Sequence, residues 1–163
     1  MFTTDLVPFG MPSSLNGLLN KSSLVVDATV QEVLPARIMS SRRLETDIKI
    51  KINAVLKGPR ITGPVVVRQF GGSIGKYTEY TTQYDLMKVG EHYIVFLSVD
   101  DRPGIPPIAG ARRYAPIGEW HGLFQVLPDN TLSLPEATPD AIRQRYQKAP
   151  LDQLMKDIQQ ASR

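Results

Sequence analysis

The sequence contains no cysteine. Disulfide scaffolds, thiolate metal sites and cysteine nucleophiles are therefore excluded. The absence of cysteine does not indicate the cellular compartment, because it is compatible with a cytoplasmic protein and with an exported bacterial protein stabilised by its core alone. The chain also lacks an apolar run near the roughly 20 residues that a helix needs to cross a bilayer, so we expect no transmembrane segment. The first ten residues show no basic start and no apolar stretch of the signal-peptide type, and Met1 is either native or replaces a removed leader.

Histidine is scarce. Only His92 and His121 occur, and neither has a second histidine or a carboxylate at ligand spacing. Because zinc recruits three or four N, S or O ligands, we interpret both as structural or solvated and predict no metal site and no cofactor.

Positive charge is also modest, since 19 Lys and Arg against 16 Asp and Glu give a net charge of +3. A dedicated nucleic-acid binder usually concentrates more positive charge on one face, so nucleic acid is not the expected partner.

The length and hydrophobic content of the chain suit one domain. It has 163 residues, of which 42% are hydrophobic. Residues 1–12 carry two prolines, and we expect an N-terminal arm there. Residues 13–163 form the predicted domain, which opens with a short helical turn through Asn20 capped by Ser13 or Ser14.

The most regular stretch is Thr46–Gly58, where apolar and polar residues alternate with a period of two. Such alternation predicts a strand with one face in a core and one face in water. The apolar face holds Thr46, Ile48, Ile50, Ile52, Ala54 and Leu56, and the polar face holds Asp47, Lys49, Lys51, Asn53 and Lys57, with only Val55 out of place. We expect the isoleucines to line a barrel and the lysines to face water.

Other short strands surround this one. Residues 24–33 predict a first strand whose phase slips by one residue near Glu32, as a β-bulge produces. Pro64–Phe70 and residues 76–84 favour strands, and His92–Val99 is nearly all apolar, which predicts a central strand buried on both faces. Residues 113–117 and 122–127 are expected to pair with each other, and residues 131–134 to follow after a turn.

Two helices are predicted to close the chain over residues 138–161. Thr138 is a candidate cap for the first, and Pro150 suits the first position of the second, where Leu151, Leu154, Met155 and Ile158 form one apolar stripe. The fold class is therefore mainly β: a small antiparallel barrel of OB-like (oligonucleotide/oligosaccharide-binding) type with two C-terminal helices and a short N-terminal helical turn. A sandwich is the alternative.

Residues Gly71–Gly75 match the G-x-S-x-G pattern of a hydrolase nucleophile elbow, with Ser73 as the nucleophile. The elbow needs a helix directly afterwards, but residues 76–82 have strand propensity, which favours a glycine-rich turn between antiparallel strands. With Lys76 the same stretch loosely matches a phosphate loop, but the spacing is one residue short and Tyr77 stands where Ser or Thr should hold magnesium.

The remaining polar residues show no clear constellation. Asp100, Asp101 and Asp129 lie in expected loops, where turn formation explains them. Basic residues interleave with aromatic ones, and on an open barrel they could form a stacking groove for a single strand of nucleic acid; a solvated strand face is the alternative. This set comprises Arg37, Arg42, Arg43, Lys49, Lys51 and Arg68 with Phe70, Tyr77, Tyr80 and Tyr84.

Five short motifs in succession resemble an uncharacterised module common in exported bacterial proteins, similar to the barrels of the netrin and tissue-inhibitor-of-metalloproteinases type. They are Ser23–Val30, Val55–Gly58, Val67–Gly72 with its double glycine, Val89–Leu97 and Gly122–Val126. The resemblance covers the chain from residue 15 to the final helix and implies the fold and a location outside the cytoplasm. Those inhibitors act through an N-terminal cysteine that chelates the protease metal. This chain has no cysteine, so no functional residue is carried over.

We therefore predict a non-catalytic binding or interaction module of the bacterial envelope or exterior, with a protein or glycan partner. No catalytic residue is expected, and the sequence does not indicate the binding residues or the oligomeric state. A serine hydrolase using Ser73 and a barrel that binds single-stranded nucleic acid are the alternatives. The expected location is periplasmic or extracellular if a leader was removed, and a cytoplasmic location is compatible as well. If an open barrel edge dimerises, we expect it at Arg37–Glu45.

Overall fold

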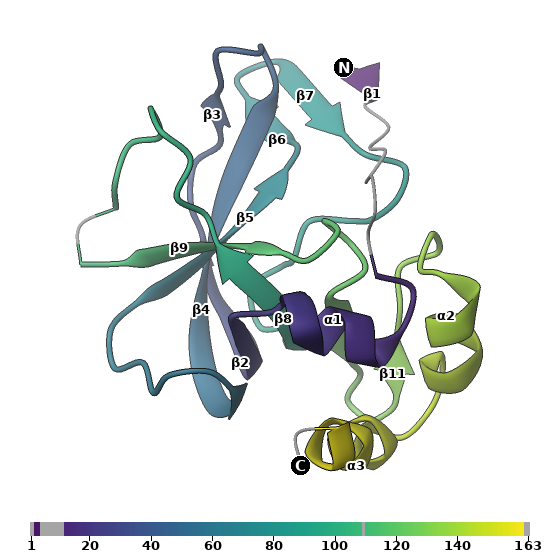
Figure 1. Cartoon of the computed structure of the whole chain (residues 1–163). Helices are drawn as coiled ribbons and strands as arrows, with labels where there is room; N and C mark the ends of the chain where they lie inside the picture. The colour runs from purple at the N-terminus through teal and green to yellow at the C-terminus, as the bar shows by residue number, and fades with distance from the viewer. Residues whose placement is uncertain (1, 4–11, 109, 162–163) are drawn as a thin grey trace.

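Five strands close into a barrel in the computed structural model, which describes residues 2–3, 12–108 and 110–161 (Figure 1). They are β2 (Leu24–Val33), β4 (Leu44–Lys57), β5 (Val65–Phe70), β8 (His92–Val99) and β9 (Arg112–Pro116). The ring runs β8–β2–β4–β5–β9 and returns to β8. Every pairing in the ring is antiparallel except β5–β9, which is parallel. The predicted small β-barrel is confirmed, and the parallel pair is a feature that the pattern did not indicate.

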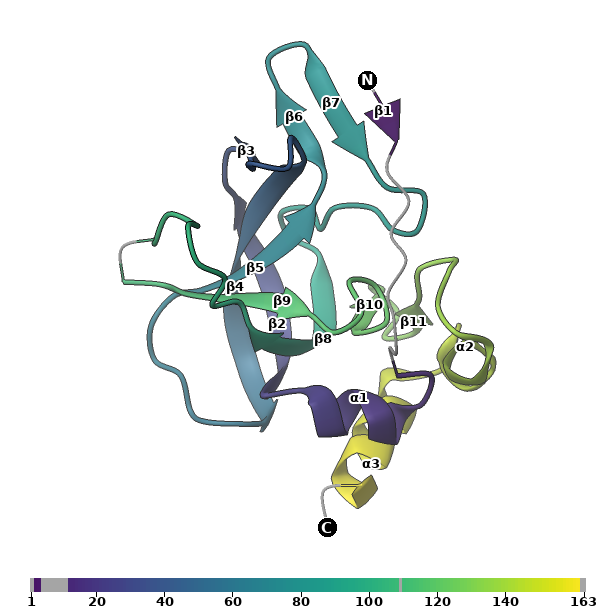
Figure 2. The ribbon, with the colours of Figure 1, turned by 45° about the horizontal axis from the view of Figure 1, so that its top comes forward.

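Smaller strands extend this ring. Strand β3 (Arg37–Ile38) pairs with the start of β4, while β10 (Leu123–Val126) joins β8 and carries β11 (Leu132–Ser133) on its other side. A hairpin of β6 (Gly72–Ile74) and β7 (Tyr77–Tyr80) projects from the barrel, and β1 (Phe2–Thr3) pairs in parallel with β7 (Figure 2). Residues 4–11 of the expected N-terminal arm lie outside the described residues.

The expected pairing of residues 113–117 with 122–127 is wrong. Strand β10 pairs with β8 over His92–Val95, and β9 pairs with β8 over Leu97–Val99, while β2 occupies the opposite edge of β8. The two strands therefore follow one another along the same edge of β8. They do not pair with each other, because each pairs with a different part of β8.

Three helices occur in the described residues: α1 (Leu15–Lys21), α2 (Asp140–Tyr146) and α3 (Leu151–Ala161). Ser14 caps α1, since its hydroxyl accepts a hydrogen bond from Gly17 N at 3.1 Å. Thr138 does not cap α2. The cap residue is Pro139, without a side-chain hydrogen bond, and the hydroxyl of Thr138 is buried with no hydrogen-bond partner in the described part of the chain. Helix α3 begins at Leu151, so Pro150 immediately precedes the helix and does not occupy its first position, where it was predicted.

Strand β4 shows how bulges change which side chains face the core. Ile48 and Ile50 line the barrel as expected, but Asn53 is an extra residue opposite β2, because Asp27 pairs with Ala54 and Ala28 with Ile52. The extra residue reverses the alternation, so Val55 packs on the barrel interior. On β2, Gln31 is extra between the pairs Val30–Ile50 and Glu32–Lys49, and the predicted bulge is confirmed.

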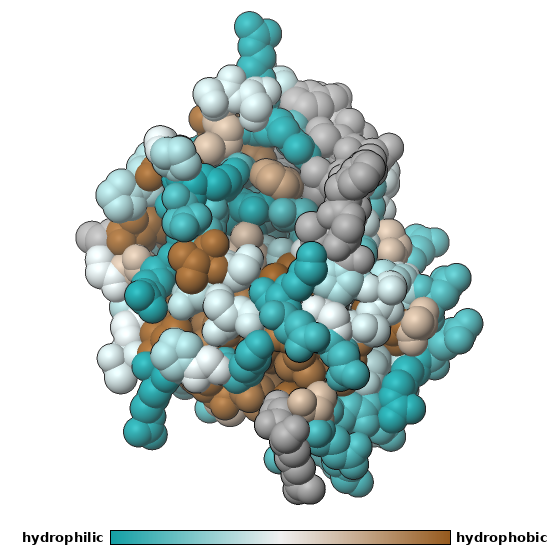
Figure 3. Space-filling model, in the orientation of Figure 1, coloured by the Kyte–Doolittle hydropathy of each residue, from teal (hydrophilic) through white to brown (hydrophobic). Residues whose placement is uncertain are grey.

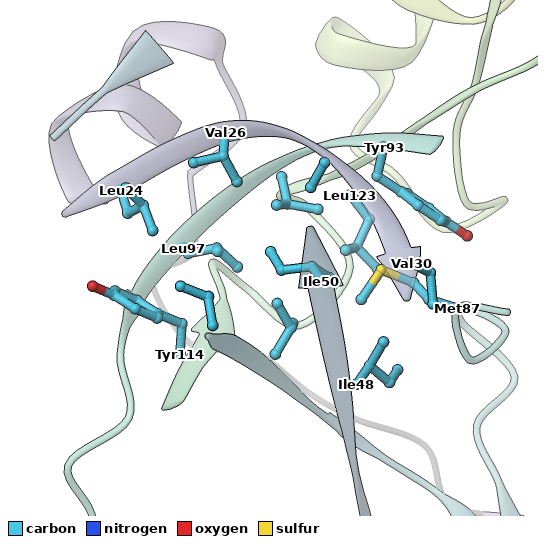
Figure 4. Packing of buried hydrophobic residues seen from close by; sticks show 14 of the residues in the cluster. Leu24, Val26, Val30, Ile48, Ile50, Met87, Tyr93, Leu97, Tyr114 and Leu123 are labelled. Carbon is cyan, nitrogen blue, oxygen red and sulfur yellow. The ribbon is translucent and has the colours of Figure 1, made fainter. Parts of the chain in front are cut away.

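Two hydrophobic clusters lie on either side of β8. The first fills the barrel, where apolar side chains from all parts of the wall point toward one another and the hydroxyls of Tyr93 and Tyr114 lie at opposite ends (Figure 4). The second lies between the barrel wall and the helices and includes Ile94, Phe96 and Ile158. Apolar side chains also reach the surface around α1 and α3 (Figure 3). Strand β8 is therefore buried on both faces, as its apolar run predicted.

Candidate functional site

A cleft of about 460 Å³ lies between the β6–β7 hairpin, the end of β2 and the segment that leads to β8. We call it the hairpin cleft. Its lining is mainly apolar, with hydroxyl groups on the hairpin side, and it comprises Val33, Phe70–Ser73, Thr78–Thr81 and Tyr84–Lys88. These segments are far apart in the sequence, so only the closed barrel brings them together.

Exposed apolar side chains gather at this end of the molecule. Among the described residues seven large hydrophobic side chains are exposed, and four of them lie on the hairpin or in the cleft lining. Val33 and Tyr80 line the cleft with exposed fractions of 40% and 45%. Ile74 and Tyr77 face each other across the hairpin. Because a gathering of exposed apolar side chains often marks an interaction site, this end is the candidate binding surface.

Buried hydrogen bonds hold the walls of the hairpin cleft in place. The hydroxyl of Tyr84 accepts from Phe70 N at 3.0 Å, and the side-chain carbonyl of Gln69 accepts from Met87 N at 2.8 Å. Burial, together with the negative charge of Glu119, raises the pKa of Tyr84, so its hydroxyl stays protonated. The segment after β7 is thereby fixed to β5, and the cleft is largely preformed.

Ser73 lies on β6, in a strand–turn–strand hairpin, and no helix follows it. Its hydroxyl oxygen is 2.9 Å from the hydroxyl oxygen of Thr78. In the described part of the chain no histidine or carboxylate forms a hydrogen bond with Ser73. The geometry is that of a glycine-rich turn between antiparallel strands.

A network of ion pairs covers the outer face of β4, β5 and β9. It is a chain of alternating carboxylates and guanidiniums, in the order Glu119, Arg68, Asp100, Arg102, Glu45, Arg37, Asp47 and Arg113. Arg102 binds Glu45 with both terminal nitrogens, at 2.9 and 2.8 Å, and contacts Asp100 at 2.7 Å. Four acids and four arginines compensate one another, which a buried set of charges requires.

The burial of Asp47 corrects a prediction. The alternating pattern placed Asp47 on the water face of β4, and it does point away from the barrel interior. It is nevertheless only 4% exposed, because the residues after β8 fold over this face and Arg113 reaches it at 2.9 Å. The sequence pattern distinguishes the two faces of a strand, but it does not show which outer face another segment covers.

The basic and aromatic residues do not form one open groove. Arg37 and Arg68 are ion-paired in the chain of charges. The ring of Phe70 lies near two guanidiniums, with Arg43 at 4.4 Å and Arg68 at 4.2 Å from its centroid. Tyr84 is buried, while Tyr77 and Tyr80 are exposed on the hairpin. The set that sequence order suggested is divided among three environments.

Each histidine has a partner that is distant in the sequence. His92 Nε2 lies 2.5 Å from a carboxylate oxygen of Asp27, which also accepts from Asn53 at 3.1 Å. His121 Nδ1 lies 3.0 Å from the carbonyl oxygen of Pro12, and burial lowers the pKa of this ring. Within the described residues no three His, Cys, Asp or Glu side chains come close enough to hold a metal ion.

Two further observations bear on the surroundings of the protein. In the described ranges no helix is both long and apolar enough to cross a membrane. In the comparisons with known proteins, no family model, no curated protein and no solved structure matches the chain.

Proposed function

We propose that this chain is a non-catalytic binding module that recognises a partner protein through the hairpin cleft. The observation that carries the proposal is the gathering of four of the seven exposed large apolar side chains of the described residues on the hairpin and in the cleft lining. Apolar side chains at the centre of an interface supply most of its burial, and hydroxyl groups on the rim fix orientation. The protein partner is preferred over a glycan because the cleft is mainly apolar.

The proposal extends to the type of barrel. Counted along the chain, the five ring strands are β2, β4, β5, β8 and β9, and the ring closes between β8 and β9. This closure supports the OB type. In that type, nucleic acid is bound on the outer face of the second and third strands. The corresponding face here is that of β4 and β5, where Arg37, Arg68 and Arg102 are paired with carboxylates. Those arginines are already neutralised by their partners, so a single strand of nucleic acid is not the proposed ligand.

For the location we propose the bacterial envelope or exterior, on the strength of the resemblance to exported modules. The netrin and tissue-inhibitor type of barrel remains the proposed relative. The gene provides a direct check, since a leader encoded immediately upstream of residue 1 supports the location, and cytoplasmic expression without a leader contradicts it.

The binding proposal predicts a clear difference between two valine variants. Peptides selected from a random phage-displayed library on the whole chain are titrated into wild type, Val33→Asp and Val99→Asp by calorimetry. Val33 lines the cleft and Val99 does not, yet both are exposed and end a strand. We expect Val33→Asp to weaken binding by roughly tenfold or more, since burying a charge against apolar groups costs more than 1.4 kcal/mol.

The control variant Val99→Asp should bind like wild type. If both variants bind equally, or if the library yields no peptide, the hairpin cleft is not a protein-binding site. Binding of glycans alone on an array would also contradict the proposed partner.

The absence of catalysis is tested separately with a fluorophosphonate probe. Because Thr78 is the one side-chain partner of Ser73 among the described residues, we expect mass spectrometry of the treated chain to detect no labelling. Labelling at Ser73 that is abolished in Ser73→Ala would establish the hydrolase alternative.

A further inference from the structure

A second cavity, of about 300 Å³, adjoins the hairpin cleft. Tyr84 and Asp85 line both cavities, so a ligand that fills one of them lies beside the wall of the other. We call the second cavity the acidic pocket. Its lining comprises residues 82–85, Tyr93, Leu123, Gln125 and residues 133–136.

The charged groups of the acidic pocket are all negative. Asp85 and Glu136 are exposed, and neither forms an ion pair or a hydrogen bond with another described residue. The described lining contains no lysine, arginine or histidine, and Lys88 belongs to the lining of the hairpin cleft alone. The acidic pocket therefore differs from the chain of charges on β4, β5 and β9, where each carboxylate has a guanidinium beside it.

Neutral groups of the pocket wall direct their donors into the protein. The hydroxyl of Tyr93 donates to one oxygen of the Glu91 carboxylate at 3.1 Å, and Gln125 Nε2 donates to the other at 2.9 Å. Burial and the negative charges of Glu91 and Asp85 raise the pKa of Tyr93, so its hydroxyl stays protonated. Because the Glu91 carboxylate only accepts, the amide nitrogen of Gln125 faces it, and the carbonyl oxygen of Gln125 has no partner among the described residues.

These groups define the chemistry that the acidic pocket can bind. The carboxylates of Asp85 and Glu136 and the carbonyl of Gln125 are three hydrogen-bond acceptors without a donor of their own among the described residues. Lysine and arginine side chains carry donors and no acceptor, and their positive charge matches that of the two carboxylates. A phosphate or a carboxylate would instead be repelled.

We propose that the partner protein presents an apolar side chain to the hairpin cleft and a lysine or arginine side chain to the acidic pocket beside it. This inference rests on the proposed function and specifies the sequence that the site prefers. The apolar contact supplies most of the burial, and the basic side chain supplies specificity through charge complementarity.

The first test is a selection from a random phage-displayed library on three forms of the whole chain. They are wild type, Asp85→Asn/Glu136→Gln, and the control Asp101→Asn/Asp152→Asn, which removes the same charge at exposed positions outside both cavities. On wild type and the control we expect lysine or arginine to be enriched at a fixed spacing from an apolar residue. On Asp85→Asn/Glu136→Gln the apolar preference should remain and the basic one should disappear.

Calorimetry with one selected peptide measures the contact itself. The peptide and a form with its basic residue replaced by glutamine are titrated into the same three proteins. Because partly exposed charge pairs are weak individually, we expect the parent peptide to bind Asp85→Asn/Glu136→Gln roughly fivefold to tenfold more weakly than wild type, with a smaller difference at high salt. The glutamine form should bind both about equally, since the two changes remove one shared interaction.

The outcomes separate the two proposals. Selected peptides without a basic residue, or a parent peptide that binds Asp85→Asn/Glu136→Gln as tightly as wild type, would overturn the role of the acidic pocket while the cleft remains the binding site. An equal loss in the control variant would also overturn it, because the attraction would then follow net charge. A peptide unaffected by Val33→Asp would overturn the proposed function itself.

Discussion

Gly58 holds the turn after β4 in a backbone conformation that other residues rarely adopt. Its φ is +104°, and a Cβ added there would lie 2.5 Å from Ser23 O, a backbone atom. We expect Gly58→Ala to lower the free energy of unfolding by roughly 1–3 kcal/mol, because backbone strain and a steric clash coincide. Urea denaturation measures the change.

Gly63→Ala is the matched control for this prediction. Its nearest contact would be Gly110 O at 3.5 Å, an ordinary van der Waals distance, and its φ is not in the positive range. The alanine should change stability by no more than about 0.5 kcal/mol or stabilise slightly. Equal effects of the two substitutions would mean that the turn at Gly58 adjusts without strain.

Among the secondary-structure elements, β8 contributes to both hydrophobic clusters and pairs with three other strands. Its inward side chains join the barrel cluster and its outward side chains join the helix cluster, so one strand connects both cores. Its edges hold β2 on one side and, in succession, β10 and β9 on the other. The hairpin differs, because most of its side chains are at least partly exposed. An element with little buried surface is suited to binding, whereas β8 is suited to stability.

At the scale of the whole molecule, the chain of charges couples stability to pH through Asp100. Burial by itself raises the pKa of Asp100, but the hydrogen bonds and charge of Arg102, with the charge of Arg68, outweigh burial and hold the pKa below its usual 3.8. A carboxyl group with a lowered folded-state pKa contributes stability above its unfolded-state pKa and loses it as the pH falls through the folded-state pKa. Glu119 acts in the opposite direction, because burial raises its pKa despite Arg68.

Asp100→Asn should therefore destabilise the chain at neutral pH by roughly 1–3 kcal/mol, since a buried charge-assisted pairing is lost. The difference from wild type should shrink as the pH falls below about 3.8, where wild type loses the same interaction. Urea denaturation at pH 7 and at pH 3 measures both effects. Asp101→Asn is the control, because Asp101 is exposed and adjacent. If the Asp100 difference persisted undiminished at low pH, the interaction would not depend on the charge of Asp100.

The sequence by itself determined the elements and their faces. Residue alternation in β4, the slip in β2 and the apolar run in β8 follow from local geometry, because side chains alternate along a strand whatever surrounds it. A helix capped at Ser13 or Ser14 and a second one starting within a residue of Pro150 were predictable for the same local reason, and so was the strand–turn–strand setting of Ser73.

Only the tertiary structure decided which segments meet. The burial of Asp47, the pairing of His92 with Asp27, and the successive placement of β9 and β10 along β8 all depend on contacts between residues far apart in the sequence. The hairpin cleft has the same origin, since Val33, Tyr80 and Leu86 carry no shared sequence signal. Closing the ring fixes the position of each strand end, and that closure is a property of the whole sheet that no single stretch encodes.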